Sequence, residues 1–151
     1  MRLKFAVFFA VSLFAGAACA AAALPVTTIT VDGAKGSTPF KVEVAGDSAS
    51  QEKGLMFRKT MAPNAGMLFD FHTTVMTSFW MKNTILPLDI IFVRADGTIS
   101  SIAANAVPFS EASIPSTEPI RAVLEINAGR ARALGIEPGD RIHAEIFHNG
   151  H

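Results

Sequence analysis

The sequence predicts a mainly β fold, a compact antiparallel β-sandwich or distorted barrel with two short helices. Three observations predict it. Short segments recur along the chain in which apolar residues alternate with polar ones or run without a break. Gly, Pro, Asp and Asn separate these segments, as they do in turns. Only two segments suit helices, and both are too short to cross over a parallel sheet.

The predicted strands differ in how many of their faces are apolar. Residues 40–44 alternate cleanly, so one face should be buried and the other wet. Residues 88–93 are apolar on both faces apart from Asp89, which places this strand at the centre of a sheet. Asp96 and Gly97 then predict a hairpin turn. The predicted strands are residues 26–31, 40–44, 67–71, 79–81, 88–93, 98–105, 120–126 and 141–146.

The two predicted helices are brief, and one connection between strands is long. Asp47 or Ser48 could cap the first helix, which ends at Gly54. The second helix covers residues 128–134. Residues 107–119 form a loop that is long for a compact domain, and long ordered loops often carry function.

The first residues are typical of a secretory signal. Arg2 and Lys4 give a positive start, and residues 5–14 form an apolar run that is too short to span a bilayer. Residues 18–20 fit the small-residue cleavage pattern, and we expect cleavage after Ala20. The protein is therefore expected in the periplasm or outside the cell.

This cleavage point sets the predicted domain organisation: a signal peptide over residues 1–20, a flexible lead-in over 21–25 and a single β-rich domain over 26–148. Lipid attachment at Cys19 is the alternative, although Gly16 stands where that modification requires a bulky aliphatic residue. Because the chain has one Cys, the cleaved protein would have no disulfide and no Cys metal ligand. No apolar stretch after the signal is long enough to cross a membrane.

The charge of the exported part excludes one class of partner. Of 13 basic residues, Arg2 and Lys4 fall within the signal, which leaves 11 basic residues against 13 acidic ones. There is no basic stripe, so we expect no nucleic-acid partner, because that binding requires phosphate neutralisation. The sequence identifies no cofactor and no protein partner.

Five motifs occur in one order along the exported part. They are Gly54-Leu55-Met56-Phe57-Arg58, Gly66-Met67-Leu68-Phe69, Phe79-Trp80-Met81-Lys82-Asn83-Thr84, Pro87-Leu88-Asp89 and Val123-Leu124-Glu125. With these motifs the chain resembles the domain of unknown function 192 family over about residues 29–146. The resemblance implies a small β-rich domain, often exported in bacteria, without an established activity. It also favours a jelly-roll-like form of the predicted sandwich.

Residues 79–84 are the strongest candidate for a site, because they place the only Trp, a Lys and an Asn among apolar residues. Such polar groups must be paired, hydrogen-bonded or in contact with a ligand, since burying them alone is costly. Trp80 could stack on a sugar ring or another flat ligand, or it could lie in the core. Asn83 could bind a ligand, whereas Thr84 suits a turn.

Lys82, Asp89, Arg58 and Glu125 form a second group, since each lies in a motif beside apolar residues. They could orient a ligand, or they could form a buried ion-pair network that fixes the fold. The sequence therefore predicts a non-catalytic binding module for a small polar ligand, for example a carbohydrate. The predicted ligand-binding residues are Trp80, Lys82, Asn83, Asp89, Arg58 and Glu125.

Three alternatives stay open, and one of them is an envelope accessory protein whose motif blocks serve only core packing. Asp89 and Glu125 could act as the acid and base of a hydrolase, provided that both carboxyls reach one cleft. The methionines between Met56 and Met81, together with His72, could instead hold Cu(I), although Met also fills gaps in cores. No zinc signature, nucleophile elbow or phosphate loop occurs, so the sequence leaves open whether the protein is an enzyme.

Overall fold

The computed structural model of the protein describes residues 23–150. The predicted signal peptide and Cys19 lie outside the described residues, as does the start of the predicted lead-in. The elements are β1 (Val26–Val31), β2 (Thr38–Ala45), α1 (Ser48–Lys53), β3 (Ala65–Val75), β4 (Ser78–Phe79), β5 (Leu88–Val93), β6 (Ile99–Ala106), β7 (Ile114–Pro115), β8 (Ile120–Asn127), α2 (Arg130–Leu134), β9 (Ile142–His143) and a 3-10 turn over Glu145–Phe147.

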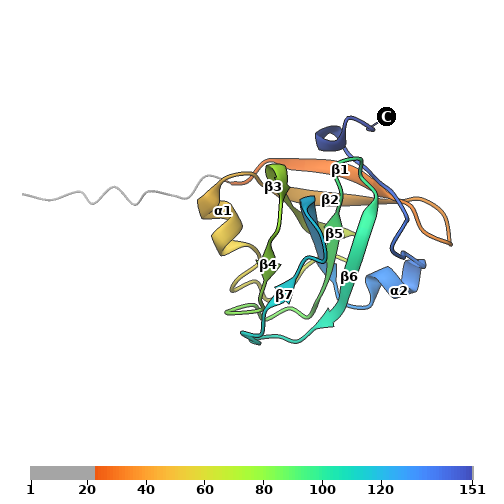
Figure 1. Cartoon of the computed structure of the whole chain (residues 1–151). Coiled ribbons are helices and arrows are strands. Elements are labelled where there is room, and N and C mark those ends of the chain that lie inside the picture. The colour runs from red at the N-terminus through yellow and green to blue at the C-terminus, as the bar shows by residue number, and fades with distance from the viewer. Residues whose placement is uncertain (1–22, 151) are drawn as a thin grey trace, which may run out of the picture.

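Seven of the described strands form one curled sheet, in the order β6-β5-β8-β3-β2-β1-β9 (Figure 1). β4 and β7 form a separate two-stranded sheet beside it. The curl brings the two edges of the large sheet together at one end. There Thr98 bridges Arg141, and the backbone N–H of Ile142 donates to the carbonyl of Gly97 over 2.8 Å. The mainly β class with two short helices is thus confirmed, in the form of a half-closed barrel.

One strand pair departs from the predicted antiparallel arrangement. β2 and β3 are parallel, and they pair from Lys41 with Ala65 to Ala45 with Phe69. A parallel pair requires a crossover, and the segment that contains α1 supplies it. Alternation along each strand gives no information on the direction of its neighbour, so the sequence pattern could not reveal this pair.

Two predicted strands are shorter than expected. The strand predicted over 141–146 pairs with β1 only at Ile142 and His143, and a 3-10 turn follows. The strand predicted over 79–81 ends at Phe79. By contrast, β1 and β5 have the predicted bounds, and α1 has the predicted cap.

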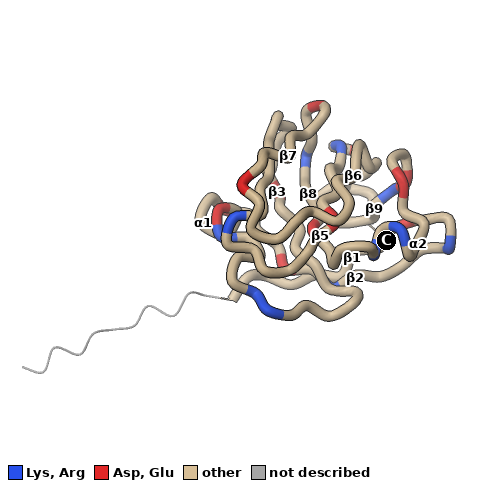
Figure 2. The backbone as a smooth tube through the Cα atoms, turned by 90° about the horizontal axis from the view of Figure 1, so that it is seen from below, with Lys and Arg blue, Asp and Glu red and all other residues tan. Residues whose placement is uncertain are grey.

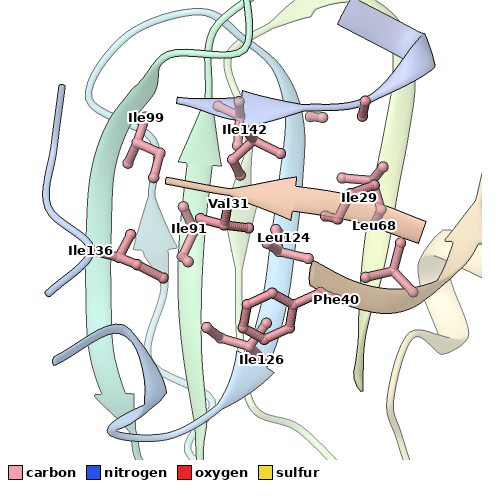
Figure 3. Close-up of a cluster of buried hydrophobic side chains, with 14 of the residues drawn as sticks. Ile29, Val31, Phe40, Leu68, Ile91, Ile99, Leu124, Ile126, Ile136 and Ile142 are labelled. Atoms are coloured by element: carbon pink, nitrogen blue, oxygen red, sulfur yellow. The ribbon is translucent and has the colours of Figure 1, made fainter. Parts of the chain in front are cut away.

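The central strands of the large sheet are buried on both faces. Inside the curl, one core cluster draws side chains from all seven strands, including Ile29, Leu124 and Ile142 (Figure 3). On the outer face, a second cluster includes Met67, Phe92, Val123 and, from the connection before β5, Met81. Successive residues of β3, β5 and β8 alternate between the two clusters, as side chains of a strand must.

Charged residues are spread over the described chain and form no continuous stripe (Figure 2). No helix among residues 23–150 is long and apolar enough to cross a membrane.

Candidate functional site

A pocket opens on the outer face of the sheet, between α1 and β4. Its volume is about 240 Å³. One wall comes from α1 and the residues after it, including Gln51, Leu55 and Met56. The opposite wall comes from Phe71, Phe79 and Trp80, and Thr84 and Glu125 also line the pocket.

The α1 wall is fixed at both of its ends. The side chain of Asp47 accepts a hydrogen bond from the backbone N–H of Ser50 over 2.9 Å, and Ser50 bonds back in a capping box. The amide of Gln51 donates to the carbonyl of Asp70 in β3 over 2.8 Å. Gly54 ends the helix with φ 47° and ψ −134°, a left-handed region that favours glycine.

Glu125 supplies the polar group of the pocket floor. It lies in the middle of β8, with Met67 of β3 and Ile90 of β5 directly beside it. The residue is only 4% exposed, and its carboxyl has no hydrogen-bond or ion-pair partner among residues 23–150. Burial raises the pKa of Glu125 to about 8, because the charged form loses its hydration without compensation.

Trp80 lies at the mouth of the pocket. Its side chain is 47% exposed, so it is not the core Trp that its apolar neighbours could indicate. The Lys82 ammonium lies 5.0 Å from the centre of the Trp80 ring, a cation–π distance. Beside Trp80, the rings of Phe79 and Phe69 pack edge to face with their centres 5.0 Å apart. This contact fixes the inner part of the aromatic wall.

Asn83 and Thr84 continue this segment. Asn83 is exposed with φ 54°, a conformation that Asn tolerates, and its amide nitrogen lies 3.9 Å from the sulfur of Met56. Together with Trp80 and Lys82 it lines a shallow depression next to the pocket. Thr84 is buried, and its hydroxyl donates to the carbonyl of Lys82 over 3.1 Å, so its predicted role in a turn is confirmed.

Arg58 does not line the pocket. Both of its terminal nitrogens donate to Glu43 over 2.5 Å, and the two side chains border another depression on the far side of α1. The hydrogen bonds from Arg58 lower the pKa of the Glu43 carboxyl, and the same bonds raise the pKa of Arg58. The structure gives this pair a role in holding the segment after α1 against β2.

Asp89 and Glu125 point to opposite faces of the sheet. Asp89 pairs with Ile126, and Ile90 pairs with Glu125, so alternation sends the two carboxyls apart. The expectation that both reach one cleft as a hydrolase pair is therefore wrong. The fully buried Asp89 carboxylate accepts three backbone N–H bonds instead, from Asn105 at 2.9 Å, Gly129 at 3.1 Å and Ala131 at 3.0 Å.

The methionines do not lie in separate layers. Met67 and Met81 are fully buried in the outer cluster, Met61 packs against it, and Met56 lines the pocket. Met76 is 62% exposed. Within residues 23–150, no group of three or more His, Cys, Asp or Glu side chains could hold a metal ion. Copper binding by thioethers stays a prediction.

The structure thus brings Trp80 and Glu125 to one pocket, with Lys82 and Asn83 at its edge, and it places Arg58 and Asp89 elsewhere. Sequence reasoning missed Gln51 and Phe71, which also line the pocket. Neither carries a local signal, because both belong to the site only through the pairing of β3 with β8 and the packing of α1. A second missed feature lies beside them. The buried Asp70 forms an ion pair with Arg121 and accepts from the N–H of His72.

A family model matches residues 28–144, most of the chain, and its description is an uncharacterized ACR. The chain belongs to the domain of unknown function 192 family. The match spans the pocket, each predicted site residue and the sheet apart from the first two residues of β1. No curated protein gives a significant match to the chain.

Two solved structures are similar to the chain. One, from Sinorhizobium meliloti 1021, is provisionally named a transcription regulator. It is 46% identical with a TM-score of 0.81, and the match covers 84% of this chain and 99% of that one. The other is a protein of unknown function from Novosphingobium aromaticivorans DSM 12444, at 45% identity and a TM-score of 0.78. That match covers 89% of this chain and 91% of the other.

Proposed function

We propose that this domain is a non-catalytic binding module for a small polar ligand, held in the pocket between α1 and β4. One observation carries the proposal. Glu125 lines the pocket with only 4% of its surface exposed, and its carboxyl has no partner among the described residues. A buried polar group of this kind costs free energy unless it is hydrogen-bonded, and a ligand would supply the missing bond.

The walls suit a ligand with one polar end and an apolar or flat body. Phe71, Phe79 and Trp80 offer apolar surface, and Thr84 and Glu125 add polar groups to the lining. The volume of about 240 Å³ is below the ~300–1,000 Å³ that is usual for drug-sized molecules. A single monosaccharide, an amino acid or a small amine or acid is therefore the appropriate size class.

We further propose that the protein acts in the periplasm or outside the cell. The support is the sequence pattern of residues 1–20, with its positive start, apolar run and small-residue cleavage pattern. Removal of this segment would leave the pocket intact, because every residue that lines it lies after Ala20.

The test is the thermal unfolding midpoint of the purified protein across a panel of monosaccharides, cell-wall fragments, amines and organic acids. A ligand at 100 times its dissociation constant stabilises the folded state by about 2.7 kcal/mol, which raises the midpoint by several degrees. We expect one class of compound to raise the unfolding midpoint of the native protein but not that of Glu125→Gln. Glu137→Gln, the same change at an exposed position, is the control.

Two results would contradict the proposal. One is an unchanged midpoint with every compound of the panel. The other is a shift that Glu125→Gln retains in full, because the ligand would then bind somewhere other than the pocket floor.

A further inference from the structure

The proposed function leaves open which polar group meets Glu125. The carboxyl lies among apolar and aromatic side chains, with Met67 and Ile90 beside it on the neighbouring strands. Phe69, Phe71, Phe79 and Trp80 also line the same pocket. Gln51, Thr77, Ser78 and Thr84 also line the pocket, but none of them donates to the carboxyl. A ligand that supplies both a counter-ion and hydrogen bonds would therefore satisfy it most completely.

The aromatic rings of the pocket favour a positively charged ligand over a negatively charged one. The faces of Phe, Tyr and Trp rings carry negative potential, so they attract cations and repel anions. Trp80 already shows this preference, because the Lys82 ammonium lies 5.0 Å from its ring centre. A cation that enters the pocket would meet aromatic rings on one wall and a carboxyl at the floor.

The charges at the rim do not satisfy Glu125. Apart from Glu125, the titratable side chains that line the described pocket are Glu52 and Lys53, both of which are exposed on α1. Among residues 23–150, neither Lys53 nor any other cation forms an ion pair with Glu125. A ligand would therefore have to supply the positive charge beside Glu125.

We propose that the pocket recognises a small organic ammonium ion, whose N–H groups donate to the Glu125 carboxylate while its carbon atoms pack against the aromatic wall. This inference rests on the proposed binding function and names the ligand class. A neutral alcohol could donate one hydrogen bond but would bring no charge, and a carboxylate would bring the wrong charge for the aromatic rings.

Binding of such a cation would release a proton. In the empty pocket near neutral pH the Glu125 carboxyl is mostly protonated, because burial raises its pKa to about 8. The ammonium favours the carboxylate, so the carboxyl proton passes to the buffer and the ligand keeps its own protons. Glu52 and Lys53, the other titratable groups at the pocket, are exposed on α1.

The test is isothermal titration calorimetry of the purified protein with n-butylammonium, 1-butanol and butyrate, which share a four-carbon chain and differ in their polar group. We expect n-butylammonium alone to bind. We also expect its binding enthalpy at about pH 7 to depend on the ionisation enthalpy of the buffer, with release approaching one proton. Glu125→Gln should weaken binding by about 10- to 100-fold, and Glu137→Gln should leave it unchanged.

A second variant tests the aromatic wall. Trp80→Leu keeps an apolar side chain at a half-exposed position and should weaken n-butylammonium by about 3- to 30-fold. Circular dichroism of each variant checks that it is folded. Affinity that is unchanged in Trp80→Leu, or in Glu125→Gln, would overturn the proposal.

The two proposals fail in different ways. Binding of 1-butanol, butyrate or a monosaccharide in place of the amine, with loss in Glu125→Gln, would overturn the ammonium class and leave the binding function standing. No binding by any of these compounds, together with an unchanged unfolding midpoint across the wider panel, would overturn both.

Discussion

Asp89 and Glu125 are two buried acidic residues on the neighbouring strands β5 and β8, but their surroundings differ. Asp89 accepts three backbone N–H bonds and so ties β5 to the end of β6 and the start of α2. Glu125 has no partner among the described residues and lines a pocket. The hydrogen-bond partners within reach therefore decide that the Asp89 carboxyl stabilises the fold and that the Glu125 carboxyl can bind a ligand.

The first prediction concerns the pH dependence of stability. The pKa of Glu125 is raised from its usual value of 4.5 to about 8, so the folded protein holds a proton that the unfolded chain releases between these values. The free energy of unfolding should therefore fall as pH rises from about 4.5 through about 8. Glu125→Gln removes this loss and should be more stable than the native protein at about pH 9, by on the order of a few kcal/mol.

Urea denaturation at about pH 5 and about pH 9 measures this difference. Other carboxyls, such as Asp70, titrate in both proteins and cancel in the comparison. Glu137→Gln should follow the native protein at both pH values. If the free energy of unfolding changed equally with pH in Glu125→Gln and in the native protein, the Glu125 carboxyl would have to be hydrated or paired.

The second prediction concerns Asp89. Asn in its place presents an N–H₂ group where a carboxylate oxygen now accepts N–H bonds, so at least one buried backbone donor loses its partner. We expect Asp89→Asn to lower the free energy of unfolding by about 2–4 kcal/mol. Asp47→Asn is the matched control, because Asn caps a helix about as well as Asp and the site is exposed. Equal stabilities in denaturant titrations would contradict the role given to Asp89.

At the scale of elements, α1 depends on the residue that ends it. Gly54 has φ 47°, and a Cβ atom there would lie 3.2 Å from the ring of Phe69, which also lines the pocket. Gly54→Ala should therefore cost about 1–3 kcal/mol of stability and weaken whatever ligand the pocket binds. Gly46→Ala, where the nearest atom would be 3.7 Å away, should be tolerated. The third prediction is wrong if thermal unfolding midpoints of the two variants agree.

The elements that sequence reasoning predicted well have strong local signals. β5 is an uninterrupted apolar run between turn residues, and α1 has an Asp cap and a closing Gly. The end of the chain was harder to predict, because the alternation over 141–146 is present although β1 pairs with only Ile142 and His143. The parallel β2–β3 pair depends on a long-range contact that no local pattern encodes.

For the whole molecule, the two core clusters share the same strands. β3, β5 and β8 each contribute alternate side chains to both clusters, so neither cluster can come apart while the other keeps its sheet. The fourth prediction is a single cooperative unfolding transition, with coincident midpoints for Trp80 fluorescence and far-ultraviolet circular dichroism. Two separated transitions would show that the face carrying the pocket unfolds by itself.

The candidate site was predictable only in part. Glu125 could be found because a charged residue inside an apolar strand needs an explanation, and Trp80 because it stands beside Lys82 and Asn83. Asp89 and Arg58 were predicted for the same reason, because sequence alone does not reveal whether a buried charge has a partner. Gln51 and Phe71 join the pocket through the packing of α1 and β3, which only the folded chain defines.

We infer that the carboxyl of Glu125, a residue only 4% exposed, has no partner until a ligand binds. The most direct measurement is a nuclear magnetic resonance titration of the Glu125 side-chain carboxyl carbon, with and without n-butylammonium. We expect a midpoint near pH 8 for the free protein and a lower midpoint with the amine bound. A midpoint near the usual 4.5 in the free protein would contradict it, because the carboxyl would then be hydrated or already paired.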